Sequence, residues 1–274
     1  MGQVANPKHP QGQNDRKLAA RQALRGLRVT LVGAVAAATI WACAQQQQTA
    51  PTPAPVPARQ AFDENRSWLD LTKQLGYGVR APGSVGHLKT RDYIADELKK
   101  TCENVRFQEF THKWSRNGQT VKMWNVIGEQ NWKKAKVRVL LLAHWDTRPT
   151  ADQEWDRARA GRPILGANDG ASGVAVLLEL ARVLKVSHPE DLGIMYLFTD
   201  GEDLGPGLDE MFLGAVHFSK NLPSPPPMYG ILLDMIGDKD LVVPMEPNSR
   251  QYAPELMDAF YAHAEAIGLG KTFP

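Results

Sequence analysis

The sequence predicts an α/β protein in which helices cover both faces of a central sheet, giving a three-layer α/β/α sandwich. Three continuous apolar runs predict the sheet, because strands buried on both faces are apolar throughout rather than alternating. These runs are residues 137–143, 193–199 and 229–235. Helical patterns separate the runs, which favours a mixed, mostly parallel sheet.

Four further elements are predicted before the first apolar run. Apolar residues at helical spacing predict helices over residues 62–75 and 87–100, joined by a Gly- and Pro-containing loop, residues 77–87. The apolar positions of the first helix are Trp68, Leu69, Leu71 and Leu75. Two strand-like segments follow, over residues 104–110 and 120–129.

Three helices are predicted between and after the apolar runs. The clearest covers residues 172–186, directly after a Gly-rich turn, and another is expected over residues 209–221. A last amphipathic helix is predicted over residues 253–268. Together these elements build the sheet and the two helical layers of one domain.

The first 43 residues have the pattern of a bacterial export leader. Residues 1–28 contain six Lys/Arg and one acid, a charge of +5, so the rest of the chain carries 2 − 5 = −3. A mostly apolar stretch of fourteen residues follows, which is short for a transmembrane helix and typical of a signal-peptide core. It ends with Ala42 before Cys43 and so resembles a lipobox, although Trp41 is an untypical occupant. We therefore expect an exported lipoprotein of the cell envelope, periplasmic or on the surface; a plain signal peptide or a single membrane anchor is the alternative.

Residues 44–60 are rich in Gln and Pro and predict a flexible, disordered tether, after which residues 61–274 form the globular domain. Membrane contact is then expected through the lipid anchor alone. Because the basic pI comes from the leader, composition gives no argument for nucleic-acid binding. With Cys43 lipidated, Cys102 has no partner for an intramolecular disulfide.

Acidic and imidazole side chains follow the apolar runs at the points where the strands are expected to end. His144 follows the first run, residues 200–203 (Asp-Gly-Glu-Asp) follow the second, and Asp234 lies at the end of the third. Asp169 lies in the Gly-rich turn before a helix. Because open α/β sheets bind ligands beyond the carboxyl ends of their strands, this edge of the sheet is the predicted site.

Each of these residues also has an ordinary structural explanation. Asp169 is well placed to be a helix N-cap, which stabilises a helix by about 1 kcal/mol. Asp234 suits a turn, Glu202 and Asp203 a solvated loop, and His144 the end of a strand. Taken together, however, clustered carboxylates repel one another unless protons or a cation neutralise them.

A divalent cation explains the cluster, and mixed His and carboxylate ligands suit catalytic zinc. Of the neighbours Glu202 and Asp203, one can bind the metal while the other remains free to move protons. GxSxG, HExxH and P-loop motifs are absent from the sequence, which gives no support to the hydrolase, zincin and nucleotide-binding classes built on them.

Four segments resemble, in order, the motifs of the zinc aminopeptidase and glutaminyl cyclase superfamily. They are "AHWDTRP", "ILGANDGASGVAVLLELARVL", "FTDGEDLG" and "YGILLDMIGD", with "VRAPGSVGH" similar to the N-terminal loop of the same group. The resemblance covers roughly residues 62–274 and is greatest to bacterial glutaminyl-peptide cyclotransferases of the animal type. It implies zinc as the cofactor and the N-termini of peptides or proteins as substrates.

The resemblance implies a role for each motif residue. Asp169 and Asp203 match metal ligands, Asp203 standing where the family usually has Glu. Glu202 matches the catalytic general acid/base. Asp234 matches a further acid of the catalytic site, a second-metal ligand in aminopeptidases and a hydrogen-bonding partner in cyclases. His144 matches the second-metal histidine of aminopeptidases.

Asp146 matches the carboxylate that orients this histidine. The family has a last metal-binding histidine near its C-terminus, whereas the one histidine after Asp234 is His263, in the middle of a predicted surface helix. We therefore expect a C-terminally truncated member that lacks one ligand and the closing strand or strands, and that is a poor enzyme unless His144 substitutes as a ligand.

Three functions follow from the resemblance. The first is zinc-dependent cyclisation of N-terminal glutamine to pyroglutamate with release of ammonia. The alternatives are a zinc aminopeptidase and an inactive, peptide-binding lipoprotein.

Overall fold

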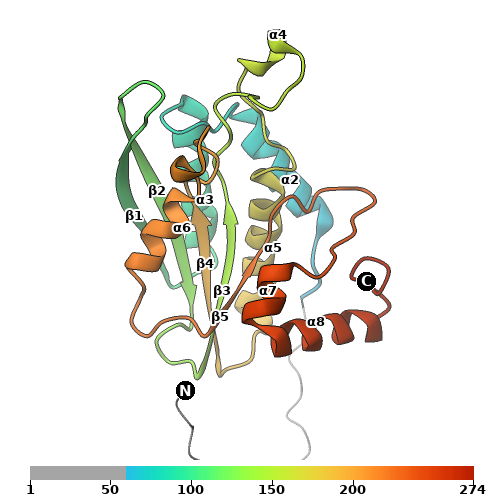
Figure 1. Cartoon of the computed structure of the whole chain (residues 1–274). Coiled ribbons are helices and arrows are strands. Elements are labelled where there is room, and N and C mark those ends of the chain that lie inside the picture. Colours follow the sequence, from blue (N-terminus) through green and yellow to red (C-terminus); the bar gives the residue numbers. More distant parts are fainter. Residues whose placement is uncertain (1–59) are drawn as a thin grey trace, which may run out of the picture. The chain divides into compact units, whose positions relative to one another are not determined.

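A computed structural model describes residues 60–274 (Figure 1). The predicted leader, with Cys43, and the predicted tether up to residue 59 lie outside the described residues. Within the described part, none of the helices combines the length and apolar character needed to cross a membrane. Cys102 is a free thiol, and burial raises its pKa to about 11.

A mixed five-stranded sheet forms the centre of the domain, with strand order β1-β2-β4-β3-β5. The strands are β1 (Asn104–Lys113), β2 (Thr120–Gln130), β3 (Val137–His144), β4 (Leu192–Thr199) and β5 (Tyr229–Leu232). β3 pairs in parallel with β4 and β5, while β2 is antiparallel to both β1 and β4. The predicted strands are all present, and β2 is the strand that makes the sheet mixed.

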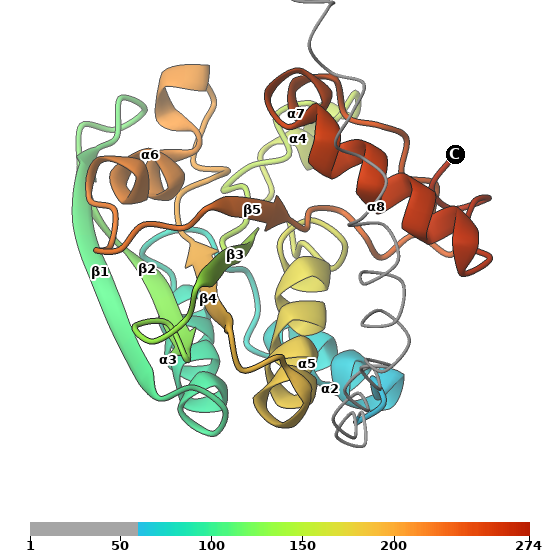
Figure 2. The same ribbon diagram turned by 90° about the horizontal axis from the view of Figure 1, so that it is seen from below.

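Helices lie on both faces of the sheet, which confirms the predicted three layers (Figure 2). The helices are α2 (Glu64–Gly76), α3 (Val85–Lys99), α4 (Arg157–Ala160), α5 (Ala171–Ser187), the 3-10 helix η1 (Leu208–Glu210), α6 (Leu213–Lys220), α7 (Pro247–Tyr252) and α8 (Pro254–Ala266). α3 and α5 pack on one face, with α2 against α5, and α6 packs on the other face over β1 and β2.

Two apolar clusters fill the spaces between these layers. The larger lies between the sheet and α3 and α5, and it contains Ile94, Leu98, Leu177, Tyr196 and Phe198 among others. The smaller lies under α6 and contains Ile127, Trp132, Met195 and Phe218 among others. β3 and β4 contribute side chains to both clusters, as expected for strands buried on both faces.

The structure corrects three sequence-based expectations. Trp68 and Leu69 of α2 are exposed, and this helix buries Ser67, Asp70 and Gln74 instead. Buried polar groups are tolerated when they are hydrogen-bonded, and Asp70 accepts a hydrogen bond from the hydroxyl of Tyr93.

β5 is shorter than its apolar run and mostly exposed, because it is an edge strand of the described sheet and pairs with β3 alone.

The helix expected over residues 209–221 begins at Leu213 rather than Asp209. Phe212 has a φ of 59°, a left-handed conformation that no helix interior contains.

Candidate metal centre and active site

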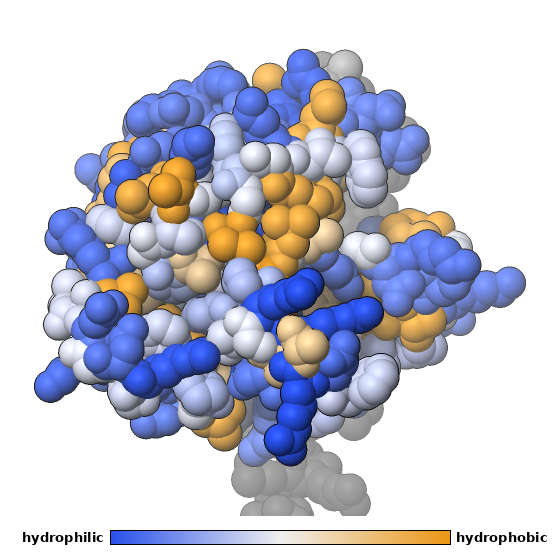
Figure 3. Space-filling model, turned by 90° about the horizontal axis from the view of Figure 1, so that it is seen from above, coloured by the Kyte–Doolittle hydropathy of each residue, from blue (hydrophilic) through white to orange (hydrophobic). Residues whose placement is uncertain are grey.

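The predicted acidic residues converge at the carboxyl ends of the parallel strands. His144 is the last residue of β3, Asp169 lies in the turn before α5, and Asp234 follows β5. Glu202 and Asp203 lie in the loop after β4. This edge faces the viewer in Figure 3, where apolar groups gather near the middle of the face and hydrophilic groups surround them.

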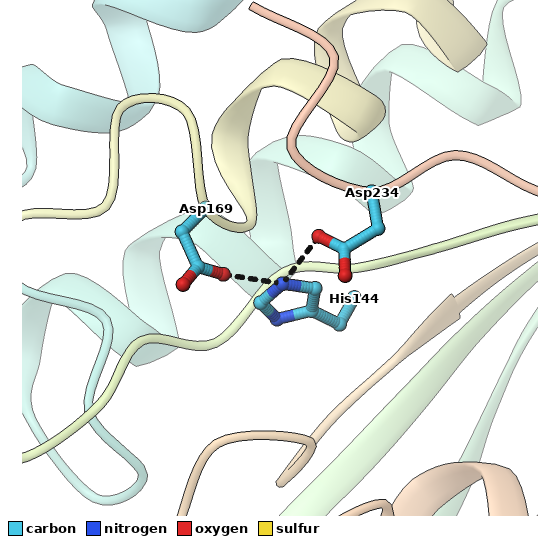
Figure 4. Close-up of side chains that lie close together, drawn as sticks. All are labelled: His144, Asp169 and Asp234. Atoms are coloured by element: carbon cyan, nitrogen blue, oxygen red, sulfur yellow. Dashed lines mark ion pairs between the residues drawn. The ribbon is translucent and has the colours of Figure 1, made fainter. Parts of the chain in front are cut away.

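His144, Asp169 and Asp234 form a compact cluster (Figure 4). Nε2 of His144 lies 2.8 Å from Oδ1 of Asp169 and 3.4 Å from Oδ1 of Asp234. One ligand atom from each residue lies within 4.8 Å of the other two. The histidine is buried, whereas the two aspartate side chains are 39% and 41% exposed. A cation held by the three side chains would therefore remain accessible from solvent.

The ring nitrogens of His144 indicate that this cluster fits a metal ion. Both are buried, and neither has a hydrogen-bond partner of acceptable geometry among the described residues. Buried polar atoms are otherwise almost always satisfied, so an unpartnered pair requires an explanation. Imidazole nitrogen and carboxylate oxygen are ligands that zinc accepts, and a cation between them would satisfy Nε2.

The charges of the cluster are mutually dependent. Burial lowers the pKa of His144, but the carboxylates of Asp146, Asp169 and Asp234 outweigh burial and hold this pKa well above its ordinary value. The same histidine lowers the pKa of Asp234. The carboxylates therefore favour positive charge at this position, from a proton on His144 or from a cation.

Asp169 is not a helix cap. The N-cap residue of α5 is Gly170, with a φ of 88°, and no side chain caps this helix. The capping explanation for Asp169 is therefore wrong, and its carboxylate is free to face His144. Arg80 holds the turn in place, because its buried guanidinium donates hydrogen bonds to the carbonyl oxygens of Leu165 and Gly166, at 2.8 and 2.6 Å.

Asp146 supports the loop that carries Glu202 and Asp203. Its side chain is fully buried, and its two oxygens each accept one backbone N–H, from Glu202 and from Asp203, both at 3.1 Å. Its Oδ1 also lies 3.5 Å from Nδ1 of His144. The resemblance predicted an orienting carboxylate here, and the contacts show that Asp146 orients the loop backbone as well as facing the histidine.

Glu202 and Asp203 have different neighbours, His144 for the first and Arg148 for the second. Oε2 of Glu202 lies 3.9 Å from Nδ1 of His144, and this carboxyl is 20% exposed. Burial raises the pKa of Glu202 to about 8; the charge of His144 opposes this rise, while Asp203, Asp146 and Asp234 add to it. A carboxyl group with such a pKa can both accept and donate a proton near neutral pH.

Asp203 pairs with Arg148, whose Nη1 lies 3.1 Å from its Oδ1. Arg148 is held in turn by Asp152. Burial chiefly, and then the charge of Asp169, raises the pKa of Asp203. The three residues that could hold a metal ion are His144, Asp169 and Asp234, and the roles of Asp169 and Asp203 as ligands stay predictions.

Two arginines of the site had no role in the sequence analysis. Arg80 lies within "VRAPGSVGH" and Arg148 within "AHWDTRP", so both occur in segments that carry the resemblance. Neither segment indicates by its pattern that an arginine is buried or paired. The contacts of Arg80 lie 65 or more residues away in the sequence, which local patterns do not reveal.

Comparisons with known proteins show the family and the fold of this chain. The model of Peptidase family M28 matches residues 125–270. A glutaminyl cyclase structure from Bacteroides thetaiotaomicron, bound to N-acetylhistamine, is 36% identical with a TM-score of 0.73, over 78% of this chain and 76% of that one. A leucine aminopeptidase precursor from the same species is 36% identical with a TM-score of 0.74, over 80% and 78%.

Curated relatives include the glutaminyl-peptide cyclotransferase of Drosophila melanogaster, 29% identical over 59% of this chain and 45% of that protein. An aminopeptidase of Bacillus subtilis is also 29% identical, over 59% of this chain and 29% of that protein. The chain spans less than half the length of these curated relatives. Solved structures and curated sequences thus include both cyclases and exopeptidases.

Proposed function

Because this chain belongs to peptidase family M28, we propose that it is a zinc-dependent glutaminyl cyclase, which converts the N-terminal glutamine of peptides to pyroglutamate and releases ammonia. The observation that carries the proposal is the position of Glu202, a single carboxyl group with a pKa of about 8 beside the metal cluster. Cyclisation needs one group that accepts a proton and returns it, and it needs no activated water.

Zinc would be held by His144, Asp169 and Asp234, with Asp203 as the further predicted ligand. This set makes Asp234 a ligand, whereas the resemblance to cyclases implies a hydrogen-bonding role for it. When bound, zinc supplies a Lewis acid that polarises the side-chain carbonyl of the substrate glutamine. Glu202 accepts a proton from the α-amino group as its nitrogen bonds to the carbonyl carbon. Glu202 then gives this proton to the departing amide nitrogen, which leaves as ammonia, so the protons balance over the reaction.

A zinc aminopeptidase is the second candidate, and Asp169 is the observation that favours it. This carboxylate faces His144 and Asp234, and its charge also acts on Asp203. An aspartate so placed is suited to bridging two cations, and a two-metal site can activate water for peptide hydrolysis. The leucine aminopeptidase precursor of similar structure supports this candidate too.

Product analysis distinguishes the two candidates. The protein is loaded with zinc and incubated with a glutaminyl dipeptide amide and, separately, with a leucyl dipeptide amide. A cyclase releases ammonia from the glutaminyl substrate and no free amino acid from either. Release of free leucine or glutamine would identify a peptidase and refute the cyclase. Zinc binding without either product would favour the third candidate, a protein that binds peptide N-termini without turnover.

We also propose that Cys43 is the lipid attachment point of an exported protein, from the order of basic, apolar and Ala-Cys segments. Cys43→Ser should release the protein from the membrane fraction or block its processing. Unchanged mobility and unchanged membrane association of this variant would refute the anchor.

A further inference from the structure

A buried histidine–aspartate pair lies directly behind the Glu202 loop. Asp200 follows β4 and is fully buried, and Nε2 of His87, on α3, lies 3.0 and 2.9 Å from its two oxygens. The carboxylate also accepts the backbone N–H of Trp124 at 2.7 Å and that of Gly201 at 2.8 Å. Three donors on one carboxylate fix both its position and the start of the loop that carries Glu202.

The proton of His87 can be placed from its contacts. Its Nδ1 accepts the backbone N–H of Gly83 at 3.3 Å, so this nitrogen carries a lone pair. The proton of the neutral ring is therefore on Nε2, the nitrogen that faces Asp200. Nε2 of His87 thus donates to Asp200, and both side chains are fully buried.

His87 also contacts the other wall of the site. Its ring stacks on Trp145, with ring centroids 4.4 Å apart and planes inclined by 17°. Trp145 lies between His144 and Asp146 in the sequence. One side chain therefore contacts both the residue that begins the Glu202 loop and the segment that carries the metal-binding histidine.

We propose that His87 is a positioning residue that fixes Glu202 relative to His144, acting through Asp200 on one side and Trp145 on the other. The backbone N–H of Gly201 is bound by Asp200, and that of Glu202 by Asp146. The loop is therefore held by two buried carboxylates, which follow the neighbouring strands β4 and β3. His87 fixes the positions of Asp200 and Asp146 relative to each other, through its contacts with Asp200 and with Trp145. This inference rests on the proposed function only for its effect on turnover.

The test compares His87→Phe, which keeps an aromatic ring against Trp145 and loses the donor, with His87→Gln, which keeps a donor near the same place. Misplacing a catalytic group by about 1 Å can cost roughly a hundredfold in rate. For His87→Phe we expect kcat for ammonia release to fall at least about tenfold with KM within about twofold, and His87→Gln should recover most of the loss. The effect should disappear in a Glu202→Gln background, because His87 acts through Glu202.

Hydrogen exchange gives a readout that does not depend on activity. His87→Phe should speed exchange of the backbone amides in residues 200–204 and leave those of β1 unchanged. Unchanged exchange and unchanged kcat would overturn the proposal, as would an equal loss of kcat in the Glu202→Gln background. If the wild-type protein releases no ammonia, exchange alone decides the positioning role, and only the proposed function fails. If His87→Phe does not fold, Asp200→Asn replaces it with the same expected results.

Discussion

Nε2 of His144 lies 2.8 Å from Oδ1 of Asp169, although neither ring nitrogen of the histidine has an acceptable hydrogen bond among the described residues. The two residues come from different elements, the end of β3 and the turn before α5. A close approach of two such atoms without an acceptable hydrogen bond is what two ligands of one cation would show. This relationship leads to the first prediction.

Asp169→Asn should weaken zinc binding strongly. Changes to residues that only support metal ligands cost roughly 10- to 100-fold in affinity, so loss of a ligand charge should cost at least about 100-fold. Asp234→Asn should weaken binding in the same direction. The measurement is competitive zinc titration against a chelating dye. Asp96→Asn, an exposed change on α3, is the matched control and should leave affinity unchanged. Wild-type affinity in Asp169→Asn would exclude this cluster as the zinc site.

Zinc binding at pH 7 should release protons. Glu202, with a pKa of about 8 caused chiefly by burial, is mostly protonated in the metal-free protein. Three carboxylates also raise the pKa of His144 and so make its imidazolium hold a proton more tightly. A bound cation disfavours both protons, so about one proton or more should leave per zinc, and affinity should rise from pH 6 to pH 8.

Calorimetry in two buffers of different ionisation enthalpy counts these protons directly. The raised pKa of Glu202 also makes the folding stability of the metal-free protein depend on pH. The pKa of Glu202 is raised above its ordinary value of 4.5, so the folded state holds more protons between about pH 4.5 and pH 8. The contribution of this group to stability is therefore lost as pH rises through that window. A zinc affinity independent of pH from 6 to 8 would contradict the prediction.

Glu202→Gln should keep zinc and lose most turnover. General acid/base groups typically contribute about 100-fold or more to the rate, and this carboxyl lies beside the cluster rather than in it. Asp203→Asn is the matched comparison, because it removes a charge one residue away. We expect it to weaken zinc binding, as the resemblance implies for this position. If Glu202→Gln lost zinc while Asp203→Asn kept it, the two roles would have to be exchanged.

The layered fold and the location of the site could be predicted from the sequence for a simple reason. Both depend on patterns that are local in the chain: apolar runs form strands, and residues at the carboxyl ends of parallel strands meet at one edge. His144, Asp169 and Asp234 were therefore expected to converge before their distances were known. The distances then selected these three as the compact cluster.

The buried polar contacts could not be predicted in the same way. His87 and Asp200 are 113 residues apart and meet only in the folded protein. The buried face of α2 was misjudged for the same reason, because Asp70 is stabilised by Tyr93 on α3 and Arg182 on α5. Hydrophobicity indicates which residues avoid water, but it does not indicate which polar residues find partners.

Arg80→Met should destabilise the domain more than any change at an exposed arginine. The guanidinium of Arg80 is fully buried and donates hydrogen bonds to the carbonyl oxygens of Trp145, Leu165 and Gly166. Methionine fills part of the space but leaves these carbonyls without donors, and it removes a positive charge that acts on Asp146 and Asp169.

Both effects lower the stability of the folded domain. Buried unsatisfied groups cost about 1–3 kcal/mol each, and the remaining carboxylates repel one another more strongly. We expect a loss of about 3 kcal/mol, seen as a Tm lowered by roughly 6–12 °C for a domain of this size. Thermal unfolding is measured with chelator present, so that zinc binding does not contribute. Arg66→Met, an exposed change on α2, should alter stability by less than about 0.5 kcal/mol. Equal Tm values for the two variants would show that the carbonyls of the Asp169 turn do not depend on Arg80.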